Sequence, residues 1–194
     1  MKYLIMSDLH GAAEEAEKVL SYYDRFGCDS ILLLGDLLNH GPRNKVPESY
    51  DPQRLADLLN GYKDVMISVR GNCDSEVDSM MFDFPCNAPY QQLLIKQEGT
   101  GKVRKVFVTH GHLHRFKDAD ELPHLALKAG DIVLSGHTHV SGVFELENGI
   151  VNVNPGSTVL GKGGTPPGFG FMDEEQISIY DLGGNRLAGH ALFG

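Results

Sequence analysis

Aspartate, histidine and asparagine side chains recur in this chain at short, repeated spacings. Asp8 and His10 stand one residue apart, and His137 and His139 repeat that spacing. On an extended strand end, residues two apart point the same way, so each pair could share one metal ion. Further residues of this kind each follow or end a short apolar run, namely Asp36, Asn72 and His110. Mixed imidazole and carboxylate ligands suit Mn, Fe or Zn better than Ca, which prefers oxygen ligands alone.

Two metal ions held close together need an anionic ligand between them. Asp36 follows Gly35 at the end of an apolar run and is the natural candidate for that bridge. Asn72 can offer a neutral amide oxygen, and His110 another imidazole nitrogen. Two ions roughly 3.5–4 Å apart activate water and steady the attacking and leaving oxygens of an in-line phosphoryl displacement. The residue types therefore point to phosphoryl-group chemistry.

Short apolar runs lead directly into every one of these polar clusters. The runs cover residues 3–7, 31–34, 65–69, 103–109 and 132–135. Their length and β-branched content predict buried strands. Because ligands collect at the carboxyl ends of parallel strands, we expect these strands to deliver their polar residues to a single crevice.

The remaining elements alternate early and become hairpin-rich late. Helical spacing predicts helices over 12–26, over 52–59 with Asp51 as the cap, over 75–81 and near 121–128. Strands are predicted over 91–96, 142–146, 150–154, 170–172, 176–182 and 186–192, with a hairpin joining 91–96 to 103–109. The 194 residues contain no linker-like change of composition, so we expect one domain spanning 1–194 in the mixed α/β (α+β) class.

Taken in order, these motifs resemble the calcineurin-like metallophosphoesterases. The matching segments are Asp8-x-His10, Gly35-Asp36, Gly71-Asn72, His110 and Gly136-His137-x-His139. Residues 154–157 are similar to the family's closing segment, and residues 39–44 and 70–74 resemble a small bacterial phosphodiesterase of this family. The resemblance implies a four-layer αββα sandwich with two mixed β-sheets and a dinuclear metal site at the strand ends.

The resemblance also divides the ligands between two divalent ions. One ion would take Asp8, His10, Asp36 and His139. The other would take Asp36, Asn72, His110 and His137. We expect Mn, with Fe, Zn or Ni as alternatives, and hydrolysis of a small phosphodiester by a hydroxide that bridges the two ions.

Two positions depart from the family pattern. Asn39 stands where the family often has a second aspartate, and Cys73 stands where a histidine usually follows the ligand asparagine. A thiol with a reference pKa of about 8.5 is neutral near pH 7 and brings no positive charge to the substrate. We therefore hypothesise that Cys73 biases the site toward diesters, which carry less negative charge than monoesters.

Several residues remain candidates for contact with the substrate. Arg43 and His40 could reach a phosphate or could equally stabilise their own loop, and Asp74, His40 or water could protonate the leaving group. His112 and His114 are interpreted as solvated loop residues. The glycine-rich stretch 161–168 lacks the Ser or Thr of a Walker loop, and we interpret it as a surface loop without an assigned role.

Composition limits the partners. The formal net charge of −9 argues against tight binding to nucleic acid, although it allows a small phosphate substrate. No apolar stretch is long enough to span a bilayer, and the first apolar run is too short for a signal peptide, so we expect a cytoplasmic location. A homo-oligomer stays open. The alternatives are a phosphomonoesterase or nucleotide pyrophosphatase on the same site, or a non-catalytic interaction module.

Overall fold

The first of two β-sheets contains the strands that precede Asp8, Asp36 and Asn72. The computed structural model describes residues 1–114, 116–118 and 120–193. Parallel neighbours β1 (Tyr3–Met6), β2 (Ser30–Leu33) and β3 (Met66–Ser68) form one half of a six-stranded sheet. The other half is antiparallel and consists of β9 (Gly168–Met172), β10 (Gln176–Asp181) and β11 (Arg186–Ala191). The sheet is therefore mixed, with its parallel part at the amino-terminal half of the chain.

The second sheet contains the strands that precede the other histidines. Its five strands lie in the order β4 (Tyr90–Lys96), β5 (Val103–Thr109), β6 (Ile132–Leu134), β8 (Val151–Asn154) and β7 (Gly142–Glu145). The central strands β5, β6 and β8 are parallel, whereas β4 and β7 pair antiparallel at the edges. The predicted hairpin is confirmed, with Tyr90 opposite Thr109.

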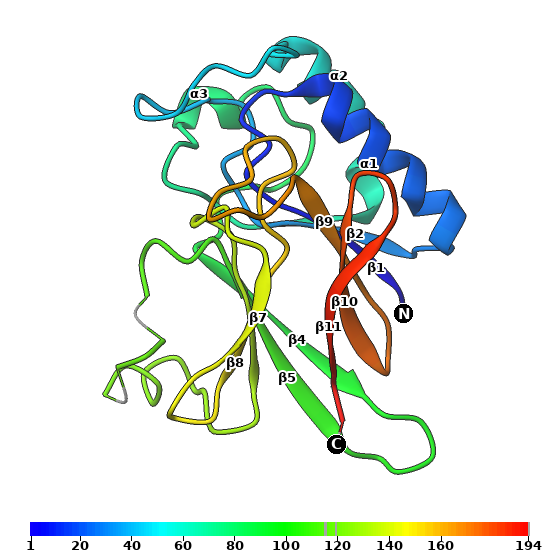
Figure 1. Cartoon of the computed structure of the whole chain (residues 1–194), viewed down its shortest axis with the longest axis vertical. Coiled ribbons are helices and arrows are strands. Elements are labelled where there is room, and N and C mark those ends of the chain that lie inside the picture. Colours follow the sequence, from blue (N-terminus) through cyan, green and yellow to red (C-terminus); the bar gives the residue numbers. More distant parts are fainter. Residues whose placement is uncertain (115, 119, 194) are drawn as a thin grey trace.

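Alternating side chains let β1 contribute to two hydrophobic cores. Leu4 and Met6 pack toward α1 (Ala13–Phe26) and α2 (Pro52–Asn60), which cover the outer face of the first sheet (Figure 1). Tyr3 and Ile5 point the other way and join the core between the sheets. Successive strand residues face opposite sides, so a continuous apolar run fits a strand buried on both faces.

Local signals in the sequence set the ends of the helices. Asp51 accepts a hydrogen bond from the Arg54 amide at the start of α2, as its sequence predicts. Gly27 ends α1 in the left-handed conformation at φ 61°. A 3₁₀ turn (Lys63–Val65) leads into β3, and Ser75 caps the short α3 (Glu76–Ser79) through a reciprocal capping box. The helices predicted over 12–26, 52–59 and 75–81 are confirmed within a few residues.

The helix predicted near 121–128 is wrong, because residues 121–126 form turns and residues 127–128 have no regular structure. The amide of Leu125 donates to the carbonyl of Glu121, but Ala126 then adopts φ 54°, which a right-handed helix does not allow. Leu122 and Leu127 still pack on Phe107 of β5 and cover the outer face of the second sheet. The fourth layer of the sandwich is therefore built from turns, while the two mixed sheets are as predicted.

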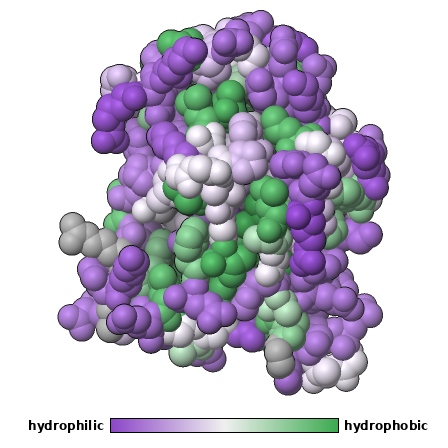
Figure 2. Space-filling model, in the orientation of Figure 1, coloured by the Kyte–Doolittle hydropathy of each residue, from purple (hydrophilic) through white to green (hydrophobic). Residues whose placement is uncertain are grey.

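The edges of the two sheets approach each other at β7 and β11. Hydrophilic residues cover most of the face in Figure 2, and hydrophobic residues gather in its middle, over the region of β7 and β10. Among the described elements, none is a helix of the length and apolar character that a bilayer crossing requires.

Candidate metal centre

The predicted ligands come from both sheets. Asp8 and His10 follow β1, Asp36 follows β2, and Asn72 follows β3. From the second sheet, His110 follows β5, while His137 and His139 follow β6. The carboxyl ends of the parallel strands of the two sheets thus meet at one crevice. The apolar runs predicted that these strand ends converge, but not how the strands divide between the sheets.

Backbone strain is concentrated at these strand ends. Apart from Ala126, every described non-glycine residue with a positive φ is a predicted ligand: Asp8 at 52°, His10 at 48°, Asp36 at 54°, His137 at 68° and His139 at 61°. Such residues rarely adopt this conformation, and each instance costs about 1–3 kcal/mol. Strain that recurs at the same kind of residue indicates a site whose geometry matters more than local stability.

Hydrogen bonds from neighbouring segments, one of them from the other sheet, hold the strained segments in place. The amide of Asp8 donates to the carbonyl of Gly35 at 3.1 Å, and that of His10 to the carbonyl of Asp36 at 3.0 Å. The amide of His137 donates to Asp8 Oδ2 at 3.0 Å, and Ser7 Oγ donates to the same oxygen at 2.6 Å. These bonds fix the Asp8 carboxylate with its other oxygen, Oδ1, free to face the crevice.

The histidine rings are oriented by backbone carbonyls behind them. Nδ1 of His10 lies 2.8 Å from the carbonyl oxygen of Asn39. Nδ1 of His110 lies 2.8 Å from the carbonyl oxygen of Leu34, and Nδ1 of His139 lies 2.9 Å from the carbonyl oxygen of Leu160. A carbonyl can only accept, so Nδ1 carries the proton in each ring. In the neutral rings, Nε2 then presents a lone pair to the crevice, as a metal ligand does.

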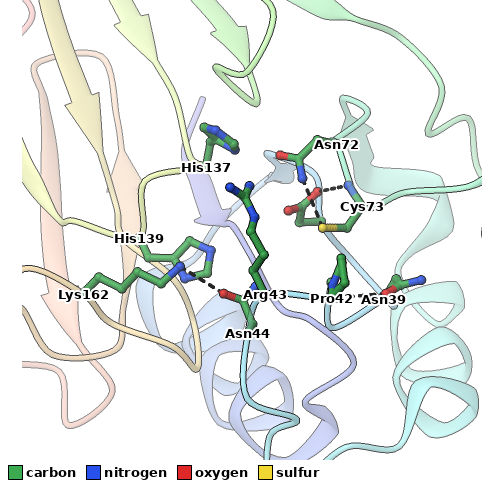
Figure 3. A pocket seen from close by; sticks show the side chains of 11 residues that line it. Asn39, Pro42, Arg43, Asn44, Asn72, Cys73, His137, His139 and Lys162 are labelled. Carbon is green, nitrogen blue, oxygen red and sulfur yellow. Dashed lines mark hydrogen bonds between the residues drawn. The ribbon is translucent and has the colours of Figure 1, made fainter.

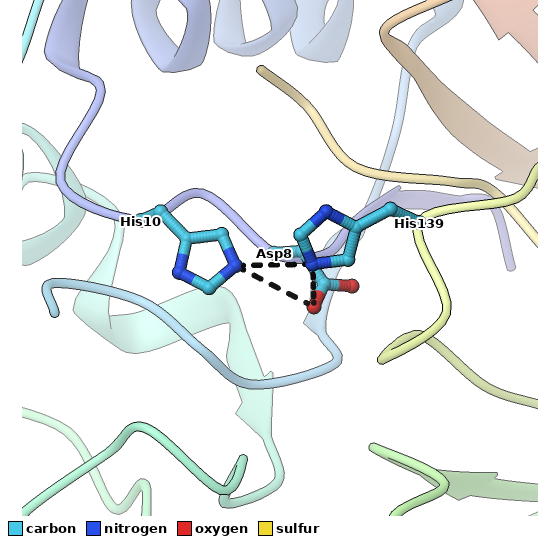
Figure 4. A group of neighbouring side chains, drawn as sticks. All are labelled: Asp8, His10 and His139. Carbon is cyan, nitrogen blue, oxygen red and sulfur yellow. Dashed lines mark hydrogen bonds and ion pairs between the residues drawn. The ribbon is translucent and has the colours of Figure 1, made fainter. Parts of the chain in front are cut away.

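The atoms that face one another in the crevice are electron-rich. Nε2 of His10 lies 3.2 Å from Nε2 of His139, and the latter atom lies 3.2 Å from Asp8 Oδ1 (Figure 4). Burial lowers the pKa of His10, which favours its neutral form. Asp8 Oδ1 is buried without a hydrogen-bond partner among the described residues. Lone pairs and an unpaired carboxylate oxygen that converge in this way fit a bound cation.

Asp36 lies between the two halves of the crevice. Its Oδ2 is 3.9 Å from His10 Nε2 and 3.4 Å from His110 Nε2, while its Oδ1 accepts the Cys73 amide at 2.7 Å. Burial would raise the pKa of Asp36, but the bond to His110 and the Cys73 amide outweigh it and lower that pKa. Burial would lower the pKa of His110, but the neighbouring carboxylates of Asp36 and Asp8 raise it to about 9. Asp36 is thus held as an anion within reach of both sides.

Asn72 and His137 complete the predicted set less tightly. Asn72 Oδ1 lies 3.1 Å from His110 Nε2, and its Nδ2 donates to Cys73 Sγ at 3.2 Å, which turns the amide oxygen toward the crevice. The ring of His137 lies 5.2 Å from that of His110 and lines the adjoining cavity. The tight groups of candidate ligand atoms found among described residues contain Asp8, His10, Asp36, Cys73, His110 and His139. His137 therefore stands at the rim of the cluster.

A cavity of about 690 Å³ opens beside this cluster (Figure 3). Arg43 and Cys73 line it, together with Asn39. Burial and the nearby charge of Asp36 raise the pKa of the Cys73 thiol to about 12, so the thiol is neutral. Asn39 stays in its own loop, where its Oδ1 accepts the Gly41 amide at 2.8 Å.

The structure does not bring His40 and Asp74 into the cavity wall. The ring of His40 meets that of Tyr50 edge to face, with centroids 5.5 Å apart. The Asp74 carboxylate accepts three backbone amides, from Asp36 at 2.9 Å, Leu37 at 2.7 Å and Gly71 at 2.7 Å. These bonds tie the segment after β2 to the segment after β3, so the geometry of Asp74 fits a positioning role.

Sequence reasoning missed Lys162, which also lines the cavity. The amide of Lys162 donates to the carbonyl of His139 at 2.9 Å, and His139 Nδ1 bonds the carbonyl of Leu160 in the same loop. The glycine-rich stretch 161–168 therefore supports His139 and brings a lysine to the site. Its composition marked a loop, but nothing in the sequence indicated where that loop would fold.

Comparisons with known proteins agree with this geometry. The family model of the calcineurin-like phosphoesterase superfamily domain matches residues 1–176. Phosphodiesterase YfcE of Escherichia coli is 42% identical over 182 residues, which cover 94% of this chain and 92% of YfcE. The probable metallophosphoesterase YsnB of Bacillus subtilis is 27% identical over 96% of this chain and 95% of its own length.

Solved structures show the same similarity in three dimensions. The structure of the E. coli phosphoesterase YfcE aligns with a TM-score of 0.87 at 39% identity, covering 99% of this chain and 100% of that one. Vps29 of Chaetomium thermophilum aligns with a TM-score of 0.64 at 19% identity, covering 98% and 96%, which is a likeness of fold alone. The chain belongs to the calcineurin-like phosphoesterase superfamily, a family of metal-dependent phosphoester hydrolases.

Proposed function

We propose that this protein hydrolyses small phosphodiesters with two divalent metal ions. The observation that carries the proposal is the convergence of unpaired Asp8 Oδ1 with the facing Nε2 atoms of His10 and His139. The proposed ligands of the first ion are Asp8, His10, Asp36 and His139, and those of the second are Asp36, Asn72, His110 and His137. The mixed nitrogen and oxygen donors favour Mn, with Fe, Zn or Ni as alternatives.

When bound, the ions would supply a water that is nucleophilic near neutral pH and would neutralise charge on the phosphoryl oxygens. In the hydrolysis, a water oxygen adds to phosphorus, the ester P–O bond breaks, and the leaving alcohol takes a proton. Arg43 extends from its loop toward the side of the cavity that carries His137 and Asn72 (Figure 3). Its guanidinium suits a bidentate contact with the phosphoryl oxygens.

The groups of this chain that could protonate the leaving alcohol are few. Asp74 is engaged with three backbone amides, and neither Asp74 nor His40 lines the cavity. We therefore propose that solvent water supplies that proton. A substrate with a good leaving group needs little such help.

Turnover of bis-p-nitrophenyl phosphate with Mn²⁺, compared with p-nitrophenyl phosphate, tests the proposal. We expect the diester to be the better substrate, and Asp36→Asn to lower its turnover by at least about a hundredfold. Residues that merely orient ligands cost 10–100-fold when mutated, and Asp36 is proposed to touch both ions. Full turnover by Asp36→Asn, or turnover without added metal after chelation, would contradict the dinuclear proposal.

The nearest alternative is a monoesterase or nucleotide pyrophosphatase on the same site. Arg43 and Lys162 give the cavity positive charge that could receive a dianionic phosphate, so the substrate comparison decides between the two activities. A non-catalytic interaction module would bind a partner and show no metal-dependent turnover. The retained donor atoms support the enzyme over the module.

Location and assembly are also proposals. The three cysteines, Cys28, Cys73 and Cys86, are all free thiols, which supports a reducing compartment such as the cytoplasm. Burial raises the pKa of Cys28 and of Cys86 to about 11, so both behave as inert buried thiols. A homo-oligomer is kept as a proposal that sedimentation would test.

A further inference from the structure

The cavity beside the candidate metal centre is lined by a second positively charged side chain, Lys162, in addition to Arg43. Its only acidic lining residue among those described is Asp36, a proposed metal ligand, whereas Arg43 and Lys162 both line it. The chain as a whole carries a formal charge of −9, so this positive charge is local to the cavity. A local reversal of charge at an active-site mouth selects anionic substrates.

Lys162 is held in place by the loop on the opposite side of the cavity. Its Nζ donates to Asn44 Oδ1 at 3.0 Å, although the two residues are 118 positions apart. Asn44 is itself fixed, because its Nδ2 donates to the carbonyl of His40 at 2.9 Å. The amide of Lys162 bonds to His139, so the lysine is anchored at both its backbone and its charged end.

The charged ends of Arg43 and Lys162 point to different parts of the cavity. Figure 3 shows Arg43 reaching toward His137 and Asn72, whereas the Lys162 side chain runs from the His139 side toward Asn44. A lysine ammonium has three donors. Asn44 takes one, and no ion pair of Lys162 with a carboxylate occurs within the described ranges, so the ammonium is available to an anion.

We propose that Lys162, positioned by Asn44, binds a second phosphate group on the substrate, distinct from the phosphodiester that is cleaved. The inference rests on the proposed function and narrows it: the substrate is a phosphodiester with a terminal phosphate on one of its two arms. Arg43 and the metal ions serve the diester, and Lys162 serves the terminal phosphate. The bond that is cleaved and the course of the hydrolysis stay the same.

A matched pair of chromogenic diesters tests the inference. One is the p-nitrophenyl ester of thymidine 5′-phosphate, and the other is the same molecule with an added 3′-phosphate. We expect the wild-type protein with Mn²⁺ to show a kcat/KM about two- to fivefold higher for the 3′-phosphorylated ester, chiefly through a lower KM. An added charge-assisted hydrogen bond at an exposed site has about that effect.

Variants separate this subsite from the catalytic centre. Lys162→Met should remove the preference for the added phosphate, because its kcat/KM should fall more on the phosphorylated ester than on the unphosphorylated one, while Lys162→Arg should retain the preference. Lys45→Met is the matched control, because Lys45 is an exposed lysine of the neighbouring loop outside the cavity lining, and the preference should persist.

The outcomes distinguish this inference from the proposed function. If neither ester is hydrolysed under any divalent metal, the proposed function fails. If both are hydrolysed but the wild type shows no preference, or Lys162→Met keeps that preference, the second-phosphate subsite is refuted and the diesterase proposal stands. Equal losses on both esters in Lys162→Met would also refute the subsite, because they would show a general effect on His139.

Discussion

At the scale of single residues, Cys73 is one of the two side chains, with Asn39, at which this site departs from the family pattern. Its sulfur accepts a hydrogen bond from Asn72 Nδ2 at 3.2 Å and lies in one group of candidate ligand atoms with His10 and Asp36. Its raised pKa of about 12, caused by burial and then by Asp36, leaves the thiol neutral. Among the described side chains that line the cavity, Arg43 and Lys162 therefore carry positive charge, whereas Cys73 does not.

Replacing Cys73 with His should shift the enzyme toward monoesters. An imidazole that can be protonated would add positive charge where a dianionic monoester needs it, so we expect the ratio of monoester to diester kcat/KM to rise about tenfold. The ratio is measured with p-nitrophenyl phosphate and bis-p-nitrophenyl phosphate under Mn²⁺. Cys73→Ser is the control of similar size and no charge. An unchanged ratio in Cys73→His, or the same rise in Cys73→Ser, would count against the role of charge.

The residues of the candidate site differ in how far the sequence could predict them. Asp8 and His10 were predictable because their identity, spacing and place after an apolar run all point to one function. Lys162 was not, because it reaches the cavity through a bond to Asn44 that no local pattern encodes. His40 shows the converse, since a histidine beside the site packs on Tyr50 instead.

At the scale of elements, close backbone approach explains the glycines that precede two of the proposed ligands, Asn72 and His137. A Cβ on Gly71 would lie 2.1 Å from Asp36 Oδ1, and one on Gly136 would lie 1.9 Å from Ser7 Oγ and 2.6 Å from Asp8 Oδ2. The segments after β3 and β6 therefore press directly against the carboxylates of the segments after β1 and β2. Glycine is required there for space, since neither residue has a positive φ.

Gly136→Ala should impair the metal centre. The added methyl group would displace Ser7 or Asp8, so we expect the affinity for Mn²⁺ to fall at least about tenfold and turnover to fall with it. Gly61→Ala is the matched control, because its Cβ would meet nothing closer than the Leu58 carbonyl at 3.1 Å, at an ordinary φ of −61°. Isothermal titration with Mn²⁺ and circular dichroism separate lost metal binding from lost folding. Wild-type metal affinity in a folded Gly136→Ala protein would contradict this steric role.

Element by element, hydrophobic periodicity predicted the strands well and the connections less well. The alternation that buries Leu4 on one side of β1 and Ile5 on the other is visible in the sequence. The division between two sheets of the five strands that precede the proposed ligands is not visible, because apolar runs carry no information about which run pairs with which. The segment 121–128 fails as a helix at Ala126, whose φ is left-handed, while Leu122 and Leu127 on either side of it pack on the second sheet.

At the scale of the whole molecule, the candidate metal centre lies where the two sheets meet, at one end of their shared core. Asp8, His10 and Asp36 follow strands of the first sheet, while His110 and His139 follow strands of the second. The inter-sheet core beneath them contains Ile5, Leu34, Val108 and Leu134, all fully buried. We propose that residues 1–194 form one domain, and metal ligands contributed by both sheets would make the two sheets unfold together.

Removal of metal should therefore destabilise the whole protein in a single step. A ligand that binds only the folded state at a hundred times its Kd adds about 2.7 kcal/mol, and 1 kcal/mol shifts Tm by about 2–4 °C for a chain of this size. We expect Mn²⁺ to raise Tm by about 5–10 °C relative to the chelated protein, with one calorimetric transition in each state. Asp36→Asn is the control and should show little metal-dependent shift, because the proposed bridge is lost. Two separate transitions would contradict the single domain, and an unchanged Tm at metal concentrations that support turnover would show that the ions do not join the sheets.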